Sequence, residues 1–260
     1  MPISRNELKN VKALQSRKGR RTQRLYLAEG IRLLEEALRF GKIPRRMYFS
    51  PSLLSERGHT LLDEYRAAGA DTVDIASSDL KRITASETSQ GLLGVFALPE
   101  TDLNELNATG LRKVLMCEHL ADPGNVGTMI RTALAFGFDL VLLCGNSADP
   151  FSPKVVRSSV GAIFGLPVIA VDIAASLEML GRHDIPILAA APLGTADLLN
   201  CLNELRHRAL ALAIGSEAEG LSDIVLEKAY ATVRIKHEDK VESLNSAVAG
   251  AILMKECYDR

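Results

Sequence analysis

The chain has 260 residues, of which 47% are hydrophobic and 24% are charged. This composition is close to the globular average and excludes the disordered and collagen-like classes, while the length suits two domains. The longest apolar runs, residues 209–214 and 247–254, fall far short of the roughly 18 residues that a membrane span requires. Because the N-terminus is also polar, we expect a cytoplasmic protein without a membrane segment. Four scattered cysteines and the lack of a Cys/His cluster predict reduced thiols and no metal site.

Positive charge is concentrated near the N-terminus. Residues 1–46 contain 13 Lys and Arg against 4 Asp and Glu, which leaves 18 basic and 28 acidic residues in the rest of the chain. This segregation favours contact between the N-terminal end and a polyanion such as RNA, with a solvated basic helix as the alternative. The densest basic cluster consists of Arg17, Lys18, Arg20, Arg21 and Arg24.

The first hundred residues are expected to alternate between helices and short strands. Ser4 and Glu7 have the spacing of a capping box, which predicts a helix close to the N-terminus. The alternation predicts a small α/β domain over residues 1–100, followed by a linker over residues 101–112 that contains Asn and Gly. Strands are predicted over 25–27, 47–49, 72–75 and 92–96.

Residues 113–260 show a more regular pattern of short apolar strands separated by helices. This pattern predicts an α/β domain with a parallel sheet covered on both faces, and ligands bind such sheets beyond the carboxyl ends of the strands. Neither GxGxxG nor GxxxxGK[ST] occurs, which argues against a nicotinamide or flavin site, a triphosphate site and a Rossmann-type methyltransferase. Strands are predicted over 114–117, 140–143, 167–171, 186–190, 210–214 and 231–235, and helices from near Asn125, Pro153, Ala174, Asp197, Ser222 and Ser243.

Three loops of this second half carry the candidate site residues. In the first, residues 122–133, Asn125 is expected to cap a helix, and Arg131 lies off the buried stripe of that helix. Helical side chains lean towards the N-terminus, so the guanidinium should reach back towards Asn125. An ordinary surface arginine is the alternative.

The second loop, residues 215–222, follows an apolar strand. Gly215 and Gly220 permit a close approach of the backbone to a ligand, and Glu217 offers an acceptor. An ordinary turn between a strand and a helix is the alternative.

The third loop, residues 241–250, enters the last helix. Ser243 and Asn245 are expected at the N-terminus of this helix, a position that suits a phosphate or a carboxylate. The helix is apolar on all sides over residues 247–254, which predicts burial in the core or against a second subunit.

In this order and spacing, the three loops resemble the signature motifs of the SpoU-type, or TrmH-like, RNA 2'-O-ribose methyltransferases of the SPOUT superfamily. Residues 149–162 are also similar to this family, and the similarity covers residues 113–258. The N-terminal half resembles the ribosomal-protein-like substrate-binding domain of members that modify ribosomal RNA, through residues 28–30 and 89–91. The matching residues are Asn125, Gly127 and Arg131 in motif one, Gly215, Glu217 and Gly220 in motif two, and Ser243, Leu244 and Asn245 in motif three.

The resemblance implies a trefoil knot in the C-terminal domain, a homodimer formed through that domain, and S-adenosylmethionine held largely by backbone groups of the knot. Two departures from the family pattern lie near this pocket. Ile235-Lys236-His237 stands where many relatives have Pro-Met, and Ser246-Ala247 stands where they often have Val-Ser. The cofactor-binding residues that the resemblance implies are Ala191, Gly194, Gly215, Glu217, Gly220, Ile235, Ser243 and Leu244.

The resemblance also implies transfer of a methyl group to a ribose 2'-hydroxyl of RNA. Large-subunit ribosomal RNA is favoured because simpler tRNA-modifying relatives tend to lack the N-terminal domain; a tRNA methyltransferase and a non-catalytic RNA-binding protein of ribosome assembly are the alternatives. Arginine stays protonated in proteins, so Arg131 is expected to stabilise developing negative charge and grip a phosphate rather than act as a general base. Glu217 is expected to order the motif-two loop or to pair with Arg131. The implied catalytic residues are Asn125, Arg131, Glu217, Ser243 and Asn245, and the RNA-binding residues are Arg17, Lys18, Arg20, Arg21, Arg24 and Arg157.

Overall fold

The computed structural model describes residues 3–86, 88–100, 103, 110–238, 240–241 and 243–258. The chain forms two compact units: Met1–Glu100 with Phe151–Gly165, and Thr101–Pro150 with Leu166–Arg260. The segment Phe151–Gly165, which the sequence pattern had placed in the second domain, packs with the first unit.

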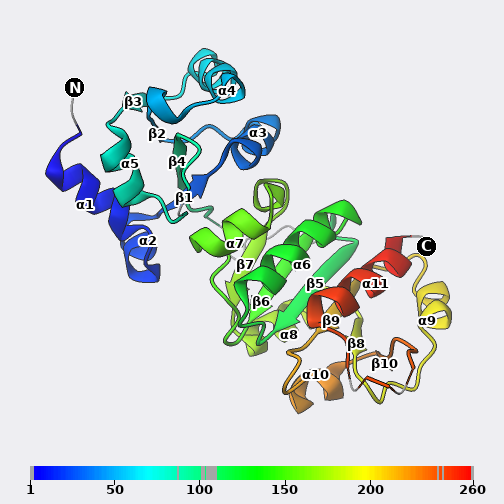
Figure 1. Ribbon diagram of the computed structural model, residues 1–260. Helices are drawn as coiled ribbons and strands as arrows, with labels where there is room; N and C mark the ends of the chain where they lie inside the picture. The colour runs from blue at the N-terminus through cyan, green and yellow to red at the C-terminus, as the bar shows by residue number, and fades with distance from the viewer. Residues whose placement is uncertain are drawn as a thin grey trace. The chain divides into compact units, whose positions relative to one another are not determined.

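The first unit is a mixed sheet covered by helices (Figure 1). Its strands are β1 (Leu25–Glu29), β2 (Arg46–Phe49), β3 (Thr72–Asp74) and β4 (Leu92–Ala97). Its helices are α1 (Arg5–Ala13), α2 (Arg17–Gln23), α3 (Ile31–Arg39), α4 (Glu56–Ala67), α5 (Ser77–Ile83) and α7 (Pro153–Ser158), with 3-10 turns η1 (Pro51–Leu53) and η3 (Ala162–Phe164). The strand order is β1-β4-β2-β3, in which β4 is antiparallel to both of its neighbours and β2 is parallel to β3.

Helix α1 belongs to the core of this unit. Its apolar side chains Leu8 and Val11 are buried in one cluster with Leu93 of β4 and Leu80 of α5. Helices α1 and α5 therefore lie together on one face of the sheet, as Figure 1 shows. A change that removes α1 exposes part of this core to water, which destabilises the whole unit.

The predicted capping box at the start of α1 is only half formed. The Ser4 hydroxyl accepts from the backbone N–H of Glu7 at 3.1 Å, as predicted. The Glu7 carboxylate, however, accepts from the Tyr48 hydroxyl at 2.7 Å and from the Arg46 guanidinium at 2.8 Å. These bonds, the one from Tyr48 above all, hold the pKa of Glu7 below its usual value. Glu7 therefore ties α1 to β2 instead of completing the cap.

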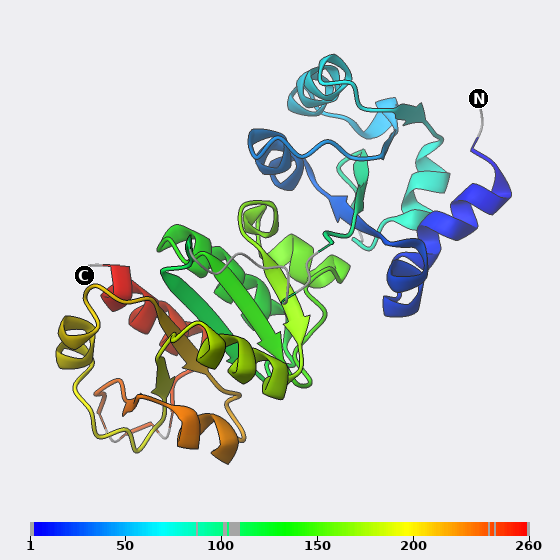
Figure 2. The ribbon, with the colours of Figure 1, turned by 180° about the vertical axis from the view of Figure 1, so that it is seen from behind.

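The second unit is a six-stranded parallel sheet, and all six strands predicted for it are confirmed. The strands are β5 (Lys113–Glu118), β6 (Leu140–Cys144), β7 (Val168–Val171), β8 (Ile187–Ala190), β9 (Leu210–Ile214) and β10 (Ala231–Val233). The helices are α6 (Pro123–Ala135), α8 (Ile173–Arg182), α9 (Leu198–Glu204), α10 (Asp223–Lys228) and α11 (Ser246–Tyr258). Helices α6 and α11 pack together on one face, and α8 lies on the opposite face (Figures 1 and 2).

The strand order of this sheet is β10-β8-β9-β5-β6-β7. The chain progresses from β5 to β7 on one side of the sheet and then continues with β8, β9 and β10 on the other side. The direction of progression therefore switches between β5 and β9, and open α/β sheets bind ligands beyond the carboxyl ends of the strands at such a point. Strand order does not record the threading of a loop, so the trefoil knot stays a prediction.

Two helices begin at other residues than predicted. Helix α6 begins at Pro123, and the Asp122 carboxylate caps it by accepting from the backbone N–H of Asn125 at 2.9 Å. The prediction that Asn125 is the cap is therefore wrong, because proline is favoured at the first helical position and moves the start upstream. Helix α11 begins at Ser246, three positions after Ser243.

The four cysteines are buried free thiols. Burial raises the pKa of Cys144 to about 11, so this thiol is protonated at neutral pH. Within the described ranges, no group of three His, Cys, Asp or Glu side chains is placed to hold a metal ion. None of the helices in those ranges is both long and apolar enough to cross a membrane.

Candidate active site

The three motifs meet at the Glu217 carboxylate. Its Oε1 atom accepts from Asn125 Nδ2 at 3.2 Å and from Asn245 Nδ2 at 2.7 Å. The same oxygen accepts from Ser246 through its backbone N–H at 2.9 Å and its hydroxyl at 3.3 Å. We call these four residues the Glu217 network. It joins the N-terminus of α6, the loop after β9 and the N-terminus of α11 in one cluster beyond the carboxyl ends of β5 and β9.

Asn245 has a fixed orientation in this network. Its Oδ1 accepts from the backbone N–H groups of Ala247 at 3.0 Å and Val248 at 3.2 Å, so the residue caps α11. Because the carbonyl oxygen is used in the cap, the amide nitrogen faces Glu217 and also donates to Asn125 Oδ1 at 3.1 Å. The helix cap thus orients the polar side chains of motifs one and three.

Arg131 lies on α6 with an exposed side chain. Among the residues that the structure describes, it makes no hydrogen bond or ion pair, so the alternative pairing with Glu217 is not formed, and the expected reach towards Asn125 stays a prediction. The guanidinium is therefore available for an anionic group of a substrate, with five N–H donors.

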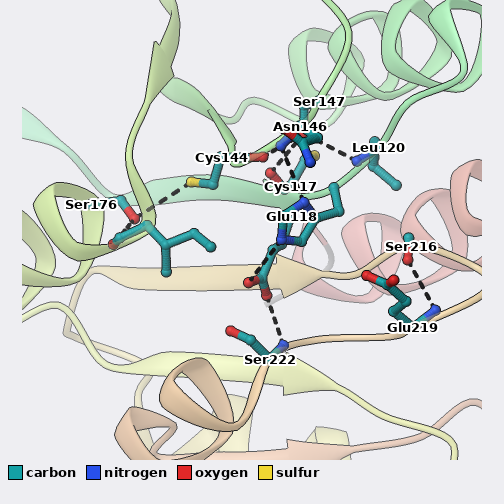
Figure 3. A network of polar contacts seen from close by, with 12 residues as sticks. Cys117, Glu118, Leu120, Cys144, Asn146, Ser147, Ser176, Ser216, Glu219 and Ser222 are labelled. Atoms are coloured by element: carbon teal, nitrogen blue, oxygen red, sulfur yellow. Dashed lines mark hydrogen bonds and ion pairs between the residues drawn. The ribbon is translucent and has the colours of Figure 1, made fainter.

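The motif-two loop is a compact turn that requires glycine at its two ends, Gly215 and Gly220. A Cβ atom on Gly215 would lie 2.1 Å from the carbonyl carbon of Gly220, so no side chain fits there. Gly220 has a φ of +69°, and its N–H donates to Ser216 O at 3.0 Å. The Ser216 hydroxyl accepts from the N–H of Glu219 at 3.1 Å (Figure 3). The turn therefore presents Glu217 from a rigid backbone.

The loop after β8 packs against β10. The N–H of Ala191 donates to Val233 O at 2.9 Å, and the N–H of Gly194 donates to Ala191 O at 3.0 Å. A Cβ atom on Gly194 would lie 2.5 Å from the carbonyl carbon of Val233, so glycine is required for this close approach. Beyond β10, Ile235 and Leu244 are half-buried.

Ser243 is the one predicted catalytic residue besides Arg131 that lies outside the Glu217 network. Its side chain is exposed, and among the described residues it has no hydrogen bond. Ser243 lies three positions before the start of α11, and Asn245 is the residue that caps this helix.

Sequence reasoning missed two polar residues of this region. Ser246 is buried and contributes two donors to the Glu217 network, although the sequence offered it only as a departure from the family pattern. Glu118 is fully buried at the end of β5 and accepts from the backbone N–H of Ser222 at 2.9 Å. A signal in the sequence could have found Glu118: it is a charged residue that ends the apolar strand β5, next to the point where the strand order of the sheet reverses.

The predicted RNA-binding residues lie in the first unit. Arg20 is buried (3% exposed) and donates to the carbonyls of Leu14 at 2.9 Å and Gln15 at 3.0 Å, so it does not lie on the surface with the other members of the basic cluster. Arg157 on α7 is exposed and lines a small cavity with Glu29 of β1. The remaining members of the basic cluster are exposed on or directly after α2: Arg17, Lys18, Arg21 and Arg24.

Comparison with known proteins gives matches over both units. Residues 112–255 match the SpoU rRNA Methylase family, and residues 5–94 match the MRM3-like substrate binding domain. The 23S rRNA (guanosine(2553)-2'-O)-methyltransferase RlmP of Bacillus subtilis is 32% identical over 251 residues, which cover 95% of this chain and 94% of that protein.

Two solved structures resemble this chain over its whole length. An RNA 2'-O ribose methyltransferase superposes with a TM-score of 0.81 at 30% identity, covering 100% of this chain and 98% of that one. An AdoMet-bound rRNA methyltransferase from Sinorhizobium meliloti superposes with a TM-score of 0.85 at 25% identity, covering 100% and 97%. Because the family match spans more than half of the sequence, the chain belongs to the SpoU rRNA methylase family.

Proposed function

We propose that this chain transfers the methyl group of S-adenosylmethionine to a ribose 2'-hydroxyl of large-subunit ribosomal RNA in the cytoplasm. The observation that carries the proposal is the Glu217 network, which joins all three motifs. Helix α6, which contributes Asn125 to this network, also carries the exposed Arg131. Ribosomal RNA is favoured over tRNA by the substrate-binding domain match and by the full-length similarity to a 23S rRNA methyltransferase.

The residues present fit S-adenosylmethionine. At Gly194 and Gly215 the chain packs directly against the backbone of Val233 and Gly220, so these loops are built from closely packed backbone, and backbone N–H and C=O groups can recognise the polar groups of the cofactor. Half-buried Ile235 and Leu244 add apolar surface. The AdoMet-bound S. meliloti relative supports this choice. When bound, the cofactor supplies an electrophilic methyl group on a sulfonium. The residues that would hold it are Ala191, Gly194, Gly215, Glu217, Gly220, Ile235, Ser243 and Leu244.

The Arg131 guanidinium stabilises the negative charge that develops on the ribose 2'-oxygen and binds the adjacent phosphate. Stabilisation of charge that develops in the transition state is among the largest contributions to catalysis. Glu217 orders the three loops, since its Oε1 already accepts from four donors. Asn125 and Asn245 hold that arrangement, and exposed Ser243 is available to an RNA phosphate.

The exposed basic cluster is expected to provide sequence-independent attraction for RNA. Replacing Arg17, Lys18, Arg21 and Arg24 together by Ala should weaken RNA binding and lower its salt dependence by about 0.7 in log–log slope for each phosphate that the protein no longer neutralises. Affinity for S-adenosylmethionine should not change. Substitution is preferable to truncation, because α1 contributes to the core. Filter binding of ribosomal RNA fragments at several salt concentrations measures the effect.

A control with three substitutions removes cations that already pair with acidic neighbours. Arg39, Arg66 and Arg82 each pair with an acidic residue three positions earlier on the same helix. Their replacement by Ala should leave RNA binding close to wild type, and an equal loss in both sets would contradict a role for the cluster.

A homodimer through α11 is the second structural part of the proposal. Val248 and Ile252 are one helical turn apart on α11 and are 49% and 39% exposed, whereas the opposite side of the helix is buried. Helix α11 packs beside α6, the helix that carries Arg131. Val248→Lys with Ile252→Lys should sediment as a monomer while wild type sediments at twice the mass of one chain. Ile224→Lys, on an exposed residue of α10, is the control and should stay dimeric.

Methyl transfer to fractionated cellular RNA tests the function itself. Tritiated S-adenosylmethionine is incubated with the protein and total RNA, and the separated fractions are digested to nucleosides. Label on a 2'-O-methylated nucleoside of large-subunit ribosomal RNA is the expected result. Label confined to tRNA would overturn the substrate, and no transfer together with no cofactor binding would favour a non-catalytic RNA-binding protein.

A further inference from the structure

A buried carboxylate lies beside the motif-two turn without belonging to any of the three motifs. Glu118, the last residue of β5, is 0% exposed. Its Oε2 accepts from the N–H of Ser222 at 2.9 Å, and its Oε1 has no hydrogen-bond partner in the described part of the chain. Burial of a carboxylate with so few partners is costly, so a residue of this kind at the switch point of the sheet calls for a functional reason.

His119 covers the second oxygen of this carboxylate. Its Nε2 lies 3.9 Å from Glu118 Oε1, and its Nδ1 accepts from the N–H of Asn146 at 3.1 Å. The second bond leaves the ring proton on Nε2, which faces Glu118. His119 has a φ of +56°, and a Cβ atom on Gly145 would lie 2.5 Å from its ring. The left-handed backbone at His119 and the missing side chain at Gly145 thus allow the imidazole to lie against the carboxylate.

The bond from Ser222 ties the outgoing end of the motif-two turn to β5. The incoming end is held by the sheet, since Ile214 of β9 pairs with Cys117 of β5. In Figure 3, Glu118 reaches from β5 to Ser222, while Ser216 and Glu219 lie on the turn. Beyond Glu118 the chain runs through three residues to Asp122, the cap of α6. The end of β5 is therefore connected both to the turn that carries Glu217 and to the helix that carries Asn125.

We infer that Glu118 is a positioning residue for methyl transfer, which holds the motif-two turn against β5 so that Glu217 meets Asn125 and Asn245. The inference rests on the proposed function, because the reaction supplies its readout. Glu118 acts through the hydrogen bond that its Oε2 accepts and does not touch the reacting atoms.

Two substitutions separate the hydrogen bond from the charge. Glu118→Ala removes the acceptor for Ser222, whereas Glu118→Gln keeps an acceptor of the same length. We expect Glu118→Ala to lower kcat/KM for S-adenosylmethionine by roughly 10- to 100-fold, in line with the cost of displacing a site by a fraction of an ångström. RNA affinity should stay unchanged, and Glu118→Gln should keep most of the wild-type activity.

The control is Ser176→Ala, which removes another fully buried polar side chain from the same unit, far in sequence from the three motifs. All variants are assayed well below the lowest Tm, with cofactor affinity measured by calorimetry and RNA affinity by filter binding. If Glu118→Ala does not fold, Ser222→Pro removes the same N–H at a residue whose φ of −67° suits proline, and the same fall is expected.

Three results would overturn the inference: unchanged kcat/KM in Glu118→Ala, an equal loss in Glu118→Gln, or a parallel loss of RNA affinity. Absence of cofactor binding by the wild-type protein would instead refute the proposed function. The two failures are therefore distinguishable.

Discussion

Arg131→Ala is expected to lower kcat for methyl transfer by about 10²–10³-fold while leaving the affinity for S-adenosylmethionine unchanged. Removal of one preorganised donor aimed at developing charge costs about this much in other enzymes. The expectation follows from the exposed guanidinium on α6, which has no partner among the described residues and can meet the ribose and its phosphate. Single-turnover transfer of a tritiated methyl group, with saturating RNA and cofactor, isolates the chemical step.

Arg131→Lys tests whether the shape of the guanidinium matters as well as its charge. Lysine keeps the charge but not the planar fork of donors, so activity between that of wild type and Arg131→Ala is expected. Arg182→Ala is the control, since this exposed arginine of α8 already pairs with Glu178 at 2.6 Å. Wild-type kcat in Arg131→Ala would contradict the assignment.

Glu217→Ala is expected to lower kcat/KM by about 10²-fold, as positional errors near a reacting centre do. The substitution leaves Asn125, Asn245 and Ser246 without the shared acceptor that aligns the three motifs. Unlike Arg131→Ala, this variant should also bind S-adenosylmethionine more weakly, because the motif-two turn is part of the proposed cofactor site. Steady-state kinetics together with calorimetry measure both effects.

Glu217→Gln distinguishes loop ordering from proton transfer. Glutamine offers a carbonyl oxygen to the same donors, so most of the activity should return if Glu217 orders the loops. An equally inactive glutamine variant would show that the carboxylate itself is required. Glu219→Ala is the matched control, because Glu219 is exposed in the same turn and takes part there through its backbone N–H.

The variants should therefore lose methyl transfer, cofactor affinity and RNA affinity in different combinations. The Arg131 variant loses the chemical step while keeping its affinity for S-adenosylmethionine, the Glu217 and Glu118 variants lose alignment of the motifs, and the basic-cluster variant loses RNA attraction. This separation is expected because the residues lie on different elements, with the basic cluster in the first unit and the three motifs in the second.

Local patterns in the sequence determined the elements of both units. Apolar runs of strand length predicted the sheets, because burial of a strand on both faces requires continuous apolar side chains. The spacing of polar residues around 125–131, 215–220 and 243–245 located the three motifs and supported the family resemblance. These inferences succeed because each depends on residues that are close together in the sequence.

Only the tertiary structure decided which polar groups share a hydrogen bond. Glu217 meets Asn125 across 92 residues, and Asn245 meets Asn125 across 120 residues. No local pattern encodes such contacts, because the strand order β9-β5 brings the loops together. The same holds for Arg20, which resembles its basic neighbours in sequence but is buried by the turn between α1 and α2. Glu118 is the clearest case: acidic side chains are mostly exposed in proteins, yet this one is fully buried and accepts a hydrogen bond from Ser222.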